Sequence, residues 1–270
     1  CCLVSNISVN IKGLGIQNLH KGITPLQIMV DIKEVSKDSI ICKVDGELTD
    51  LSAQLLNDCD LQFMDAKSKD GHSVLLHSTA HLMAQAVKRL FPETKVTIGP
   101  FLENKFYYDF DVKTPFSEED LKRIEEEMYN ISNENLDIIH EEKSRDEALK
   151  FFDQIGEDYK VEIINDLDKN EILKVYSQGE FTDLCRGPHI PSTGVIKHFK
   201  LLSSSAAYWR GDEKNQTLQR VYGTSFQNSK DLKKYLLMLE EQKKRDHRKI
   251  GKELDLFFFD DEIGPGLPLW

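Results

Sequence analysis

Two hydrophobic periods occur in this chain, and they limit the fold classes that it can adopt. Residues Ile7 to Ile11 alternate apolar and polar side chains, a period of two that is typical of a half-buried strand. Residues Ser73 to Leu90 instead carry apolar side chains at the spacing of a helix. No internal repeat or low-complexity tract accompanies either pattern. The mixture predicts an α+β protein.

The first sixty-odd residues are predicted to form a small β-rich unit. Thr24 is a suitable capping residue and precedes Pro25, which suits the first position of a short helix. Strands are predicted at Ile40–Val44 and Leu61–Phe63, and the first of them is followed by a turn at residues 45–46. A ubiquitin-like β-grasp is compatible with this pattern, although periodicity alone does not select that fold.

The rest of the chain is predicted to mix helices and strands after a polar linker at Lys67–Gly71. Helices are expected at Ser73–Leu90, Ser117–Asn130, Ser144–Ile155 and Asp231–Leu254. Strands are expected at Phe106–Asp111, around Leu136–His140, and within a strand- and turn-rich region from Val175 to Gly223. Ser117 is predicted to cap its helix, with Asp120 at the third position of a capping box.

Length, charge and cysteine usage narrow the class of protein. A chain of 270 residues predicts two or three domains. The formal charge of −11 argues against a protein that coats nucleic acid non-specifically. The stretch from Ser229 to Lys252 differs, because it holds nine Lys or Arg against four Asp or Glu, so it is suited to phosphates.

Several absences in the sequence point to a soluble, intracellular protein. No apolar run approaches the roughly 18 residues that a membrane-spanning helix needs. The first residues show no basic segment followed by an apolar one, so no signal peptide is visible. The five cysteines are odd in number and contain no C-x-x-C pair, which suits a reducing compartment.

Two short motifs carry the side chains best suited to chemistry. His77 and His81 are four residues apart, so on a helix both imidazoles would project from one face. The segment D-L-C-R-G-P-H, from Asp183 to His189, places a thiol and an imidazole on either side of a Gly-Pro turn. Three histidines and Cys185 form a complete tetrahedral ligand set for zinc.

Each motif also has an ordinary structural explanation. An isolated H-x-x-x-H on a helix is often incidental, and a single cysteine such as Cys185 is more often a small buried apolar residue than a ligand. The two motifs together, with Gly187 and Pro188 shaping the turn, favour a functional site. The other five histidines have no such neighbours in the sequence.

The sequence resembles the N-terminal part of threonyl-tRNA synthetases. The editing domain of that family is matched by H-S-T-A-H at 77–81, G-P at 99–100, F-Y-Y-D at 106–109, D-L-C-R-G-P-H at 183–189, Y-W-R-G-D at 208–212 and L-Q-R-V-Y-G at 218–223. G-E-L-T-D-L-S at 46–52 is similar to the family's TGS domain, and R-D-H-R-K-I-G at 245–251 to its linker helix. The segment P-G-L-P-L-W at 265–270 resembles the opening of the class II catalytic core.

The resemblance implies an α+β chain of four parts. A small TGS-like β-grasp domain is expected at 1–66, a larger α+β editing domain with a cleft at 67–228, a basic linker helix at 229–253, and the start of a truncated class II core at 254–270. The zinc, ATP and magnesium of the family belong to that core, so the chain itself is not expected to aminoacylate.

The resemblance implies hydrolysis of seryl-tRNA for threonine by water attack. His77 and His81 would contact the terminal adenosine, with His77 near the ribose hydroxyl. Cys185 and His189 would hold the ester carbonyl and the water, and Asp183 would bind the substrate ammonium.

Two further residues would complete the reaction. Lys160 is expected to activate the water as a desolvated lysine near a cationic neighbour, and Tyr108 to donate its hydroxyl near that water. In the alternative, non-functional interpretation, Lys160 is an exposed residue on a strand edge. Lys243, Lys244 and Arg245 are expected to meet phosphates of the tRNA.

Three expectations concern cofactors, partners and location. The editing site is expected to hold no metal, because the family's editing site is thought to work without one, whereas related alanyl-tRNA editing domains hold zinc with a similar His/Cys set. The chain is expected to be a monomer and the full-length protein a homodimer, in the cytoplasm or an organelle, with threonine tRNA as partner and no membrane. The alternatives are a zinc-dependent trans-editing hydrolase of the alanyl type and a non-catalytic tRNA-binding module.

Overall fold

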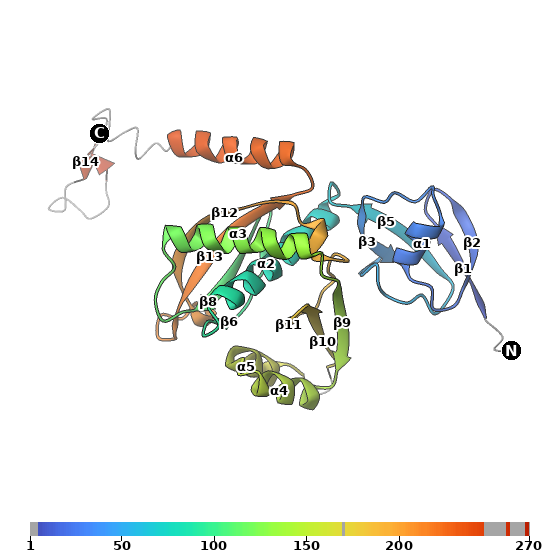
Figure 1. The fold of residues 1–270 in the computed structure, drawn as a ribbon, viewed down its shortest axis with the longest axis horizontal. Coiled ribbons are helices and arrows are strands. Elements are labelled where there is room, and N and C mark those ends of the chain that lie inside the picture. Colours follow the sequence, from blue (N-terminus) through green and yellow to red (C-terminus); the bar gives the residue numbers. More distant parts are fainter. Residues whose placement is uncertain (1–4, 169–170, 246–257, 260–267, 270) are drawn as a thin grey trace. The chain divides into compact units, whose positions relative to one another are not determined.

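The computed structural model describes residues 5–168 and 171–245, and the backbone of residues 258–259 and 268–269. The described residues form a mixed α+β structure with several sheets, as predicted (Figure 1). One compact unit ends at Gln227 and a second begins at Asn228. None of the helices in the described ranges is both long and apolar enough to cross a membrane.

The N-terminal part is a five-stranded sheet in the order β2-β1-β5-β3-β4 (Figure 1). Its strands are β1 (Asn6–Ile11), β2 (Gly15–His20), β3 (Ser39–Val44), β4 (Glu47–Thr49) and β5 (Cys59–Asp65). Strand β1 runs parallel to β5, and the other pairs are antiparallel. The predicted strands within β1, β3 and β5 are confirmed, whereas β2 had no prediction.

Helix α1 (Pro25–Asp31) packs its buried residues onto this sheet and begins as predicted. The Thr24 side chain accepts a hydrogen bond from the backbone of Gln27, whose side chain accepts one from the backbone of Thr24. This reciprocal pair satisfies backbone donors at the start of the helix. The turn between β3 and β4 is also confirmed, because Asp45 and Gly46 both have positive φ, as tight hairpins require.

Helix α2 (Lys69–Leu90) is the buried centre of the larger α+β region. It begins four residues before the predicted Ser73, so most of the expected linker is helical. The Ser68 side chain caps the helix by accepting a hydrogen bond from Gly71. A Cβ at Gly71 would lie 2.0 Å from the carbonyl oxygen of Asp65, so glycine lets the preceding strand lead directly into the helix. The polar composition of residues 67–71 predicted a linker, so this direct connection from strand to helix could not be predicted from it.

A second sheet packs against α2 (Figure 1). Its order is β12-β13-β8-β6, with β12 at His198–Tyr208, β13 at Thr217–Phe226, β8 at Lys105–Asp111 and β6 at Lys95–Val96. The short β7 (Phe101–Leu102) pairs with β8. Helix α3 (Glu118–Glu134) contacts α2 and carries the predicted capping box of Ser117 and Asp120. The register places Tyr108 opposite Val221, in the fully buried core.

A third sheet has the order β11-β10-β9, with β9 at Ile138–Lys143, β10 at Leu173–Gln178 and β11 at Phe181–Leu184. Helices α4 (Arg145–Gln154) and α5 (Asp158–Asp166) share a small apolar core with β10, formed by Ala148, Phe152, Ile164, Leu173 and Val175. Helix α4 was predicted, whereas α5 was not. Two short 3-10 turns, η1 (Thr193–Val195) and η2 (Trp209–Gly211), complete this unit.

The second unit contains helix α6 (Ser229–Lys244), capped by the side chain of Asn228. The predicted helix at Asp231–Leu254 is confirmed as far as Lys244, and residues 246–257 lie outside the described part. None of the helix residues is buried, and Leu237 and Met238 are exposed. The strand pair β14 (Phe258–Phe259) and β15 (Pro268–Leu269) closes the described chain. The rest of the expected core segment at 254–270 is not described.

Candidate active site

The structure brings together the four side chains of the two motifs. His77 and His81 lie on α2, and Cys185 and His189 lie in the segment that follows β11. The nitrogen and sulfur atoms that these residues offer are all within 4.8 Å of one another. We call these four residues the His–Cys cluster. His81 and His189 are buried, whereas His77 and Cys185 keep partial access to solvent.

Hydrogen bonds fix the orientation of the His77 ring. Its Nδ1 lies 3.2 Å from the carbonyl oxygen of Gly99, and its Nε2 lies 2.9 Å from the sulfur of Cys185. A carbonyl oxygen only accepts hydrogen bonds, so Nδ1 carries the proton and Nε2 accepts the thiol proton. Gly99 packs on Tyr108, because a Cβ there would lie 2.3 Å from the tyrosine ring. The G-P motif at 99–100 thus holds one end of the cluster.

His189 is held through Ser78, a residue for which the sequence carried no prediction. Its Nδ1 lies 2.9 Å from the Ser78 hydroxyl oxygen, which also accepts a hydrogen bond from the backbone of Ile190. The other ring nitrogen, Nε2, lies 3.4 Å from the sulfur of Cys185. Gly187 has a φ of 68°, and a Cβ there would lie 2.0 Å from the Tyr176 hydroxyl, so only glycine fits this turn.

A buried group of three polar residues, Lys160, Asp183 and Tyr108, lies beside the cluster. The Lys160 ammonium forms an ion pair with Asp183 and donates to the Tyr108 hydroxyl at 3.2 Å. The Tyr108 hydroxyl donates to the other Asp183 oxygen at 2.7 Å. His81 connects the two groups, because its Nε2 lies 3.6 Å from Asp183. We call these three residues the Lys–Asp–Tyr group.

Lys160 lies on α5 and is 2% exposed, so its alternative interpretation as an exposed strand-edge residue is wrong. The expectation of a cationic neighbour is also not met, because the charged group in contact is the Asp183 carboxylate. The carbonyl oxygen of Thr97 accepts a further hydrogen bond from Lys160 at 2.6 Å. Burial of a lysine is costly unless it is paired and hydrogen-bonded, and these three partners meet that need.

Burial keeps the side chains of the His–Cys cluster uncharged at neutral pH. It lowers the pKa of His81 and His189 well below the ordinary value and lowers the pKa of His77 as well. Burial raises the pKa of the Cys185 thiol to about 12. The site therefore presents neutral imidazoles, which accept and donate hydrogen bonds, and a thiol rather than a thiolate.

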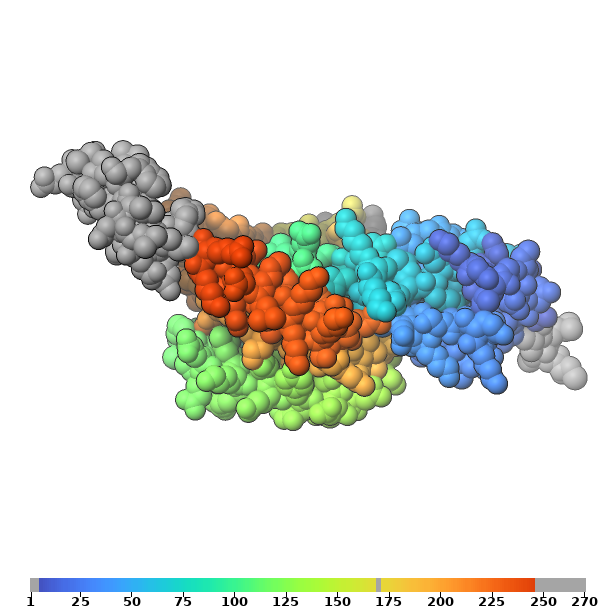
Figure 2. Space-filling model, turned by 90° about the horizontal axis from the view of Figure 1, so that it is seen from above, coloured from blue at the N-terminus to red at the C-terminus, as the bar shows by residue number. Residues whose placement is uncertain are grey.

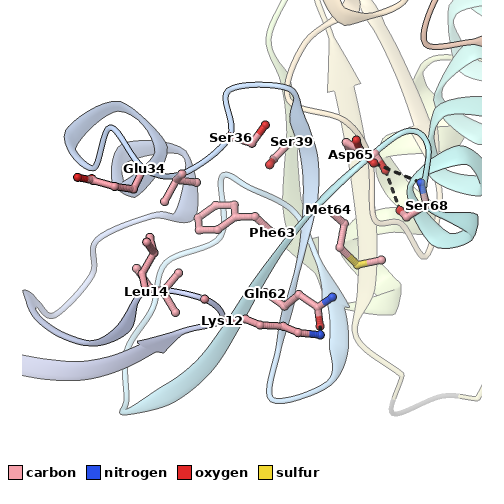
Figure 3. Close-up of a pocket in the computed structure, with 13 residues that line it drawn as sticks. Lys12, Leu14, Glu34, Ser36, Ser39, Gln62, Phe63, Met64, Asp65 and Ser68 are labelled. Carbon is pink, nitrogen blue, oxygen red and sulfur yellow. Dashed lines mark hydrogen bonds between the residues drawn. The ribbon is translucent and has the colours of Figure 1, made fainter.

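A pocket of about 350 Å³ reaches the cluster at Cys185. Its other polar lining residues are Glu171, Lys174 and Arg186. Its apolar lining comes from α5, β10, β11 and the segment between α5 and β10. A larger open pocket, of about 450 Å³, lies on the N-terminal sheet near Lys12, Phe63 and Asp65 (Figure 3). None of the residues that line the larger pocket belongs to the cluster. Of these two pockets, the smaller one is therefore the one that contacts the residues best suited to chemistry.

Comparison with known proteins shows which proteins the chain resembles. A family model described as "Threonyl and Alanyl tRNA synthetase second additional domain" matches residues 173–222. The threonine–tRNA ligase of Symbiobacterium thermophilum is 49% identical over 267 residues, and that of Pelobacter propionicus is 52% identical over 268 residues. The resemblance to threonyl-tRNA synthetases is confirmed. The alignments cover 98% and 99% of this chain, but only 41% and 42% of the two relatives.

The threonine–tRNA ligase of Geobacter sp. strain M21 is 53% identical over 236 residues, which are 87% of this chain and 37% of that protein. The chain thus spans about two fifths of the length of the threonine–tRNA ligases that it matches. The region that matches the family model includes Asp183, Cys185 and His189. The other members of the His–Cys cluster and the Lys–Asp–Tyr group precede that region and lie within the longer alignments to the ligases.

The donor types of the His–Cys cluster fit a zinc ion, but one spacing does not. Zinc bonds of about 2.0 Å to nitrogen and 2.3 Å to sulfur would hold tetrahedral ligand atoms about 3.5 Å apart. His77 Nε2 and the Cys185 sulfur are 2.9 Å apart, a hydrogen-bond distance. Ser78 on the far nitrogen of His189 would suit either arrangement, since zinc-bound histidines also use such partners. The arrangement thus resembles a hydrogen-bonded network, with a donor set that could close around zinc.

The residues expected to meet the tRNA lie at the end of α6 and just beyond it. Lys243, Lys244 and Arg245 are all exposed. Lys244 and Arg245 lie 3.5 and 3.6 Å from the Glu241 carboxylate, as exposed ion pairs. Such pairs are weak and exchange readily with other anions.

Four residues that contact the site had no prediction: Ser78, Thr97, Asp50 and Tyr176. Ser78 lies inside the H-S-T-A-H motif, where its place between two histidines is the only signal. Thr97 acts through its backbone oxygen, so its side-chain type gives no clue. Asp50 lies in the G-E-L-T-D-L-S motif but reaches residues more than 100 positions away in the chain.

Proposed function

We propose that this chain carries a hydrolytic proofreading site that cleaves seryl-tRNA for threonine. The observation that carries the proposal is the meeting of the His–Cys cluster with the Lys–Asp–Tyr group through His81 and Asp183. The similarity to threonine–tRNA ligases and to the additional domain of threonyl and alanyl synthetases supports it. Together these give groups that can bind a ribose, an ammonium and a water molecule in one place.

Physical chemistry explains why such a ligase needs a second site. Serine is threonine without one methyl group, and a pocket gains only about 1–3 kcal/mol of discrimination from such a group. A hydrolytic site that admits serine and excludes the extra methyl supplies the missing selectivity. The pocket around the substrate side chain must then be tight and resistant to expansion.

The His–Cys cluster would orient the ester. His77 and His81 would contact the terminal adenosine, with the ring edge of His77 near a ribose hydroxyl. Cys185 and His189 would hold the carbonyl and the attacking water as neutral hydrogen-bonding groups. The raised pKa of Cys185 favours this role over covalent attack, since the thiolate is the nucleophilic form.

The Lys–Asp–Tyr group would bind the substrate ammonium and activate the water. Asp183 now balances the charge of Lys160. When the ammonium of the substrate also approaches Asp183, two cations share one carboxylate, and their repulsion favours loss of a proton from Lys160. The ammonium of the bound substrate would then be the expected cationic neighbour of Lys160. Tyr108, bonded to both residues, would keep the water in line.

The reaction then balances as a simple hydrolysis. The oxygen of water bonds to the ester carbonyl carbon while Lys160 takes one proton. The bond from that carbon to the ribose oxygen breaks, and the ribose oxygen receives the proton that Lys160 took from the water. The carboxylic acid so formed loses its proton to solvent, so serine leaves as a carboxylate, and threonine tRNA is released with a free terminal hydroxyl. Hydrogen-bond donors around the carbonyl stabilise the charge that develops on its oxygen.

A second candidate is a zinc-dependent hydrolase of the alanyl type. The three imidazoles and one thiol of the His–Cys cluster favour it, as does a family model that covers both threonyl and alanyl domains. In that case residues of the same cluster would hold the ion, which would activate a water in a position that they leave open. The two candidates differ in zinc content and in the need for Lys160.

The remaining parts of the chain receive roles that follow the family. We propose that residues 1–66 are a TGS-like β-grasp domain, which the sheet order and the parallel pairing of β1 with β5 support. Helix α6 would approach the phosphates of threonine tRNA. Aminoacylation, with ATP and the catalytic zinc, is proposed only for a whole ligase of this family.

Hydrolysis of charged tRNA by the chain tests the proposal. Threonine tRNA charged with radioactive serine is incubated with the chain, and the released serine is counted over time. Loss of release when His77 and His81 are both changed to alanine supports the proposal. Retained release in that double variant would place the reaction elsewhere, and no release by the unaltered chain would leave a binding module.

A further inference from the structure

Asp50 joins the N-terminal sheet to the candidate site. It follows β4 directly and is 6% exposed. One of its carboxylate oxygens accepts a hydrogen bond from the backbone N–H of His189 at 2.7 Å. The other accepts one from the Tyr176 hydroxyl at 2.8 Å and lies 3.2 Å from Nδ1 of His140. The surfaces of the N-terminal residues and of the start of α2 adjoin in the space-filling view (Figure 2).

These contacts call for a carboxylate at position 50. The backbone of His189 and the hydroxyl of Tyr176 both point donors at the same side chain. An ionised carboxylate only accepts hydrogen bonds and offers two oxygens, so it satisfies both donors at once. An alanine there would leave a buried N–H and a buried hydroxyl without these partners, which is costly.

Asp50 holds His189 through two of these contacts. The backbone hydrogen bond fixes the main chain of His189 itself. The Tyr176 ring lies 4.5 Å from the His189 ring, and its hydroxyl occupies the space over Gly187. Tyr176 is also the cross-strand partner of Asp183. Loss of the carboxylate would therefore loosen His189 and the turn at Gly187. It would also loosen Tyr176, which pairs with Asp183 of the Lys–Asp–Tyr group.

We propose that Asp50 is a positioning residue of the hydrolytic site, through which the N-terminal sheet holds His189 in place for catalysis. The inference rests on the proposed function, because it concerns the turnover of that reaction. Asp50 does not touch the reacting atoms. It acts through the backbone of His189 and the side chain of Tyr176. Its removal therefore lowers the rate at which bound substrate is hydrolysed and leaves the affinity for substrate unchanged.

Three variants of the chain test this inference in the deacylation assay with seryl-tRNA for threonine. Asp50→Ala removes both acceptor oxygens. Asp50→Asn keeps the shape of the side chain and one acceptor oxygen, and Tyr176→Phe removes only the hydroxyl. We expect turnover at saturating substrate to fall about tenfold or more in Asp50→Ala, the equivalent of one lost hydrogen bond to a charged group. The drops in Asp50→Asn and Tyr176→Phe are expected to be smaller, and KM to stay near its original value in all three. Asp38→Ala, which removes an exposed carboxylate of the same sheet region, is the control expected to keep full activity.

A double-mutant cycle separates positioning from general loss of stability. If Asp50 acts through His189, Asp50→Ala adds little further loss in a His189→Ala background. An equal loss in both backgrounds, or unchanged turnover in a folded Asp50→Ala variant, would overturn the inference. If Asp50→Ala does not fold, Asp50→Asn and Tyr176→Phe decide, and unchanged turnover in both overturns it. Inactivity of the unaltered chain would instead refute the proposed function, so the two failures are distinguishable.

Discussion

Lys160 and Asp183 form a buried ion pair between helix α5 and strand β11. Both residues are almost wholly excluded from solvent, at 2% and 1% exposed. An ion pair this deep contributes little net stability, since desolvation of the two charges offsets their attraction. A buried pair beside three histidines is instead typical of a site where charges are arranged for a reaction.

Replacement of Lys160 by alanine is expected to lower turnover on seryl-tRNA by about 100-fold or more, the usual range for a lost general base. The KM should change little, because the lysine acts on the water rather than on the tRNA. Single-turnover and steady-state rates of serine release measure both quantities. Lys150→Ala removes an exposed lysine of the neighbouring α4 and is the matched control. Normal turnover in Lys160→Ala would return this residue to a structural role.

The active site is expected to contain no zinc after purification without chelators. The 2.9 Å separation of His77 Nε2 and the Cys185 sulfur, which is shorter than two ligands of one zinc ion would allow, favours a metal-free network. Elemental analysis by mass spectrometry gives the zinc content per chain, and the assay is repeated with a chelator. One zinc per chain, with activity that chelation removes and added zinc restores, would establish the alanyl-type mechanism instead.

Much of this arrangement could be predicted from the sequence, because it rests on local patterns. The spacing of His77 and His81 predicted a shared helix face, and Gly187 with Pro188 predicted a turn that presents Cys185 and His189. The position of Lys160 could not be predicted in this way. Its helix, α5, has only nine residues and lacks a side-chain cap, so its local signal is weak.

The contact of Asp50 with His189 could not be predicted for a different reason. It joins residues 139 positions apart, and an aspartate after a short strand carries no local mark of such a partner. Ser78 is similar, because its bond to His189 exists only once α2 and the turn have met. Tertiary packing, rather than any local preference, creates these positioning contacts.

The stability of the chain is expected to fall as the pH drops below about 6.5. Burial lowers the pKa of His81 and His189 in the folded chain, whereas in the unfolded chain both titrate near their ordinary value of about 6.5. The unfolded chain then binds more protons, so this stability is complete above pH 6.5 and is lost toward the lower folded values. The difference in Tm between pH 7.5 and pH 5, measured by thermal unfolding, should be smaller for His189→Gln than for the unaltered chain. Equal differences would contradict this account, and a change at the exposed His20 serves as control.

Simultaneous replacement of Lys243, Lys244 and Arg245 by alanine is expected to weaken binding of threonine tRNA and flatten its salt dependence. Each lost phosphate contact should reduce the slope of log affinity against log salt by about one. Titrations at several salt concentrations measure this slope. The exposed lysines of the first turns of α6, Lys230, Lys233 and Lys234, provide a control with the same change of charge. An identical effect of both triple changes would assign the binding to overall charge rather than to the end of the helix.

The central claim is serine-selective hydrolysis, and the ratio of two deacylation rates tests it most directly. The chain is mixed with threonine tRNA charged with serine and, separately, with threonine, at enzyme concentrations high enough to bind all the tRNA. We predict that serine is released at least about tenfold faster, because threonine's extra methyl would clash with the wall of a pocket sized for serine. We also predict that this release is lost in the His77→Ala, His81→Ala double variant. Equal rates for the two amino acids, or release that persists without the histidines, would contradict the account.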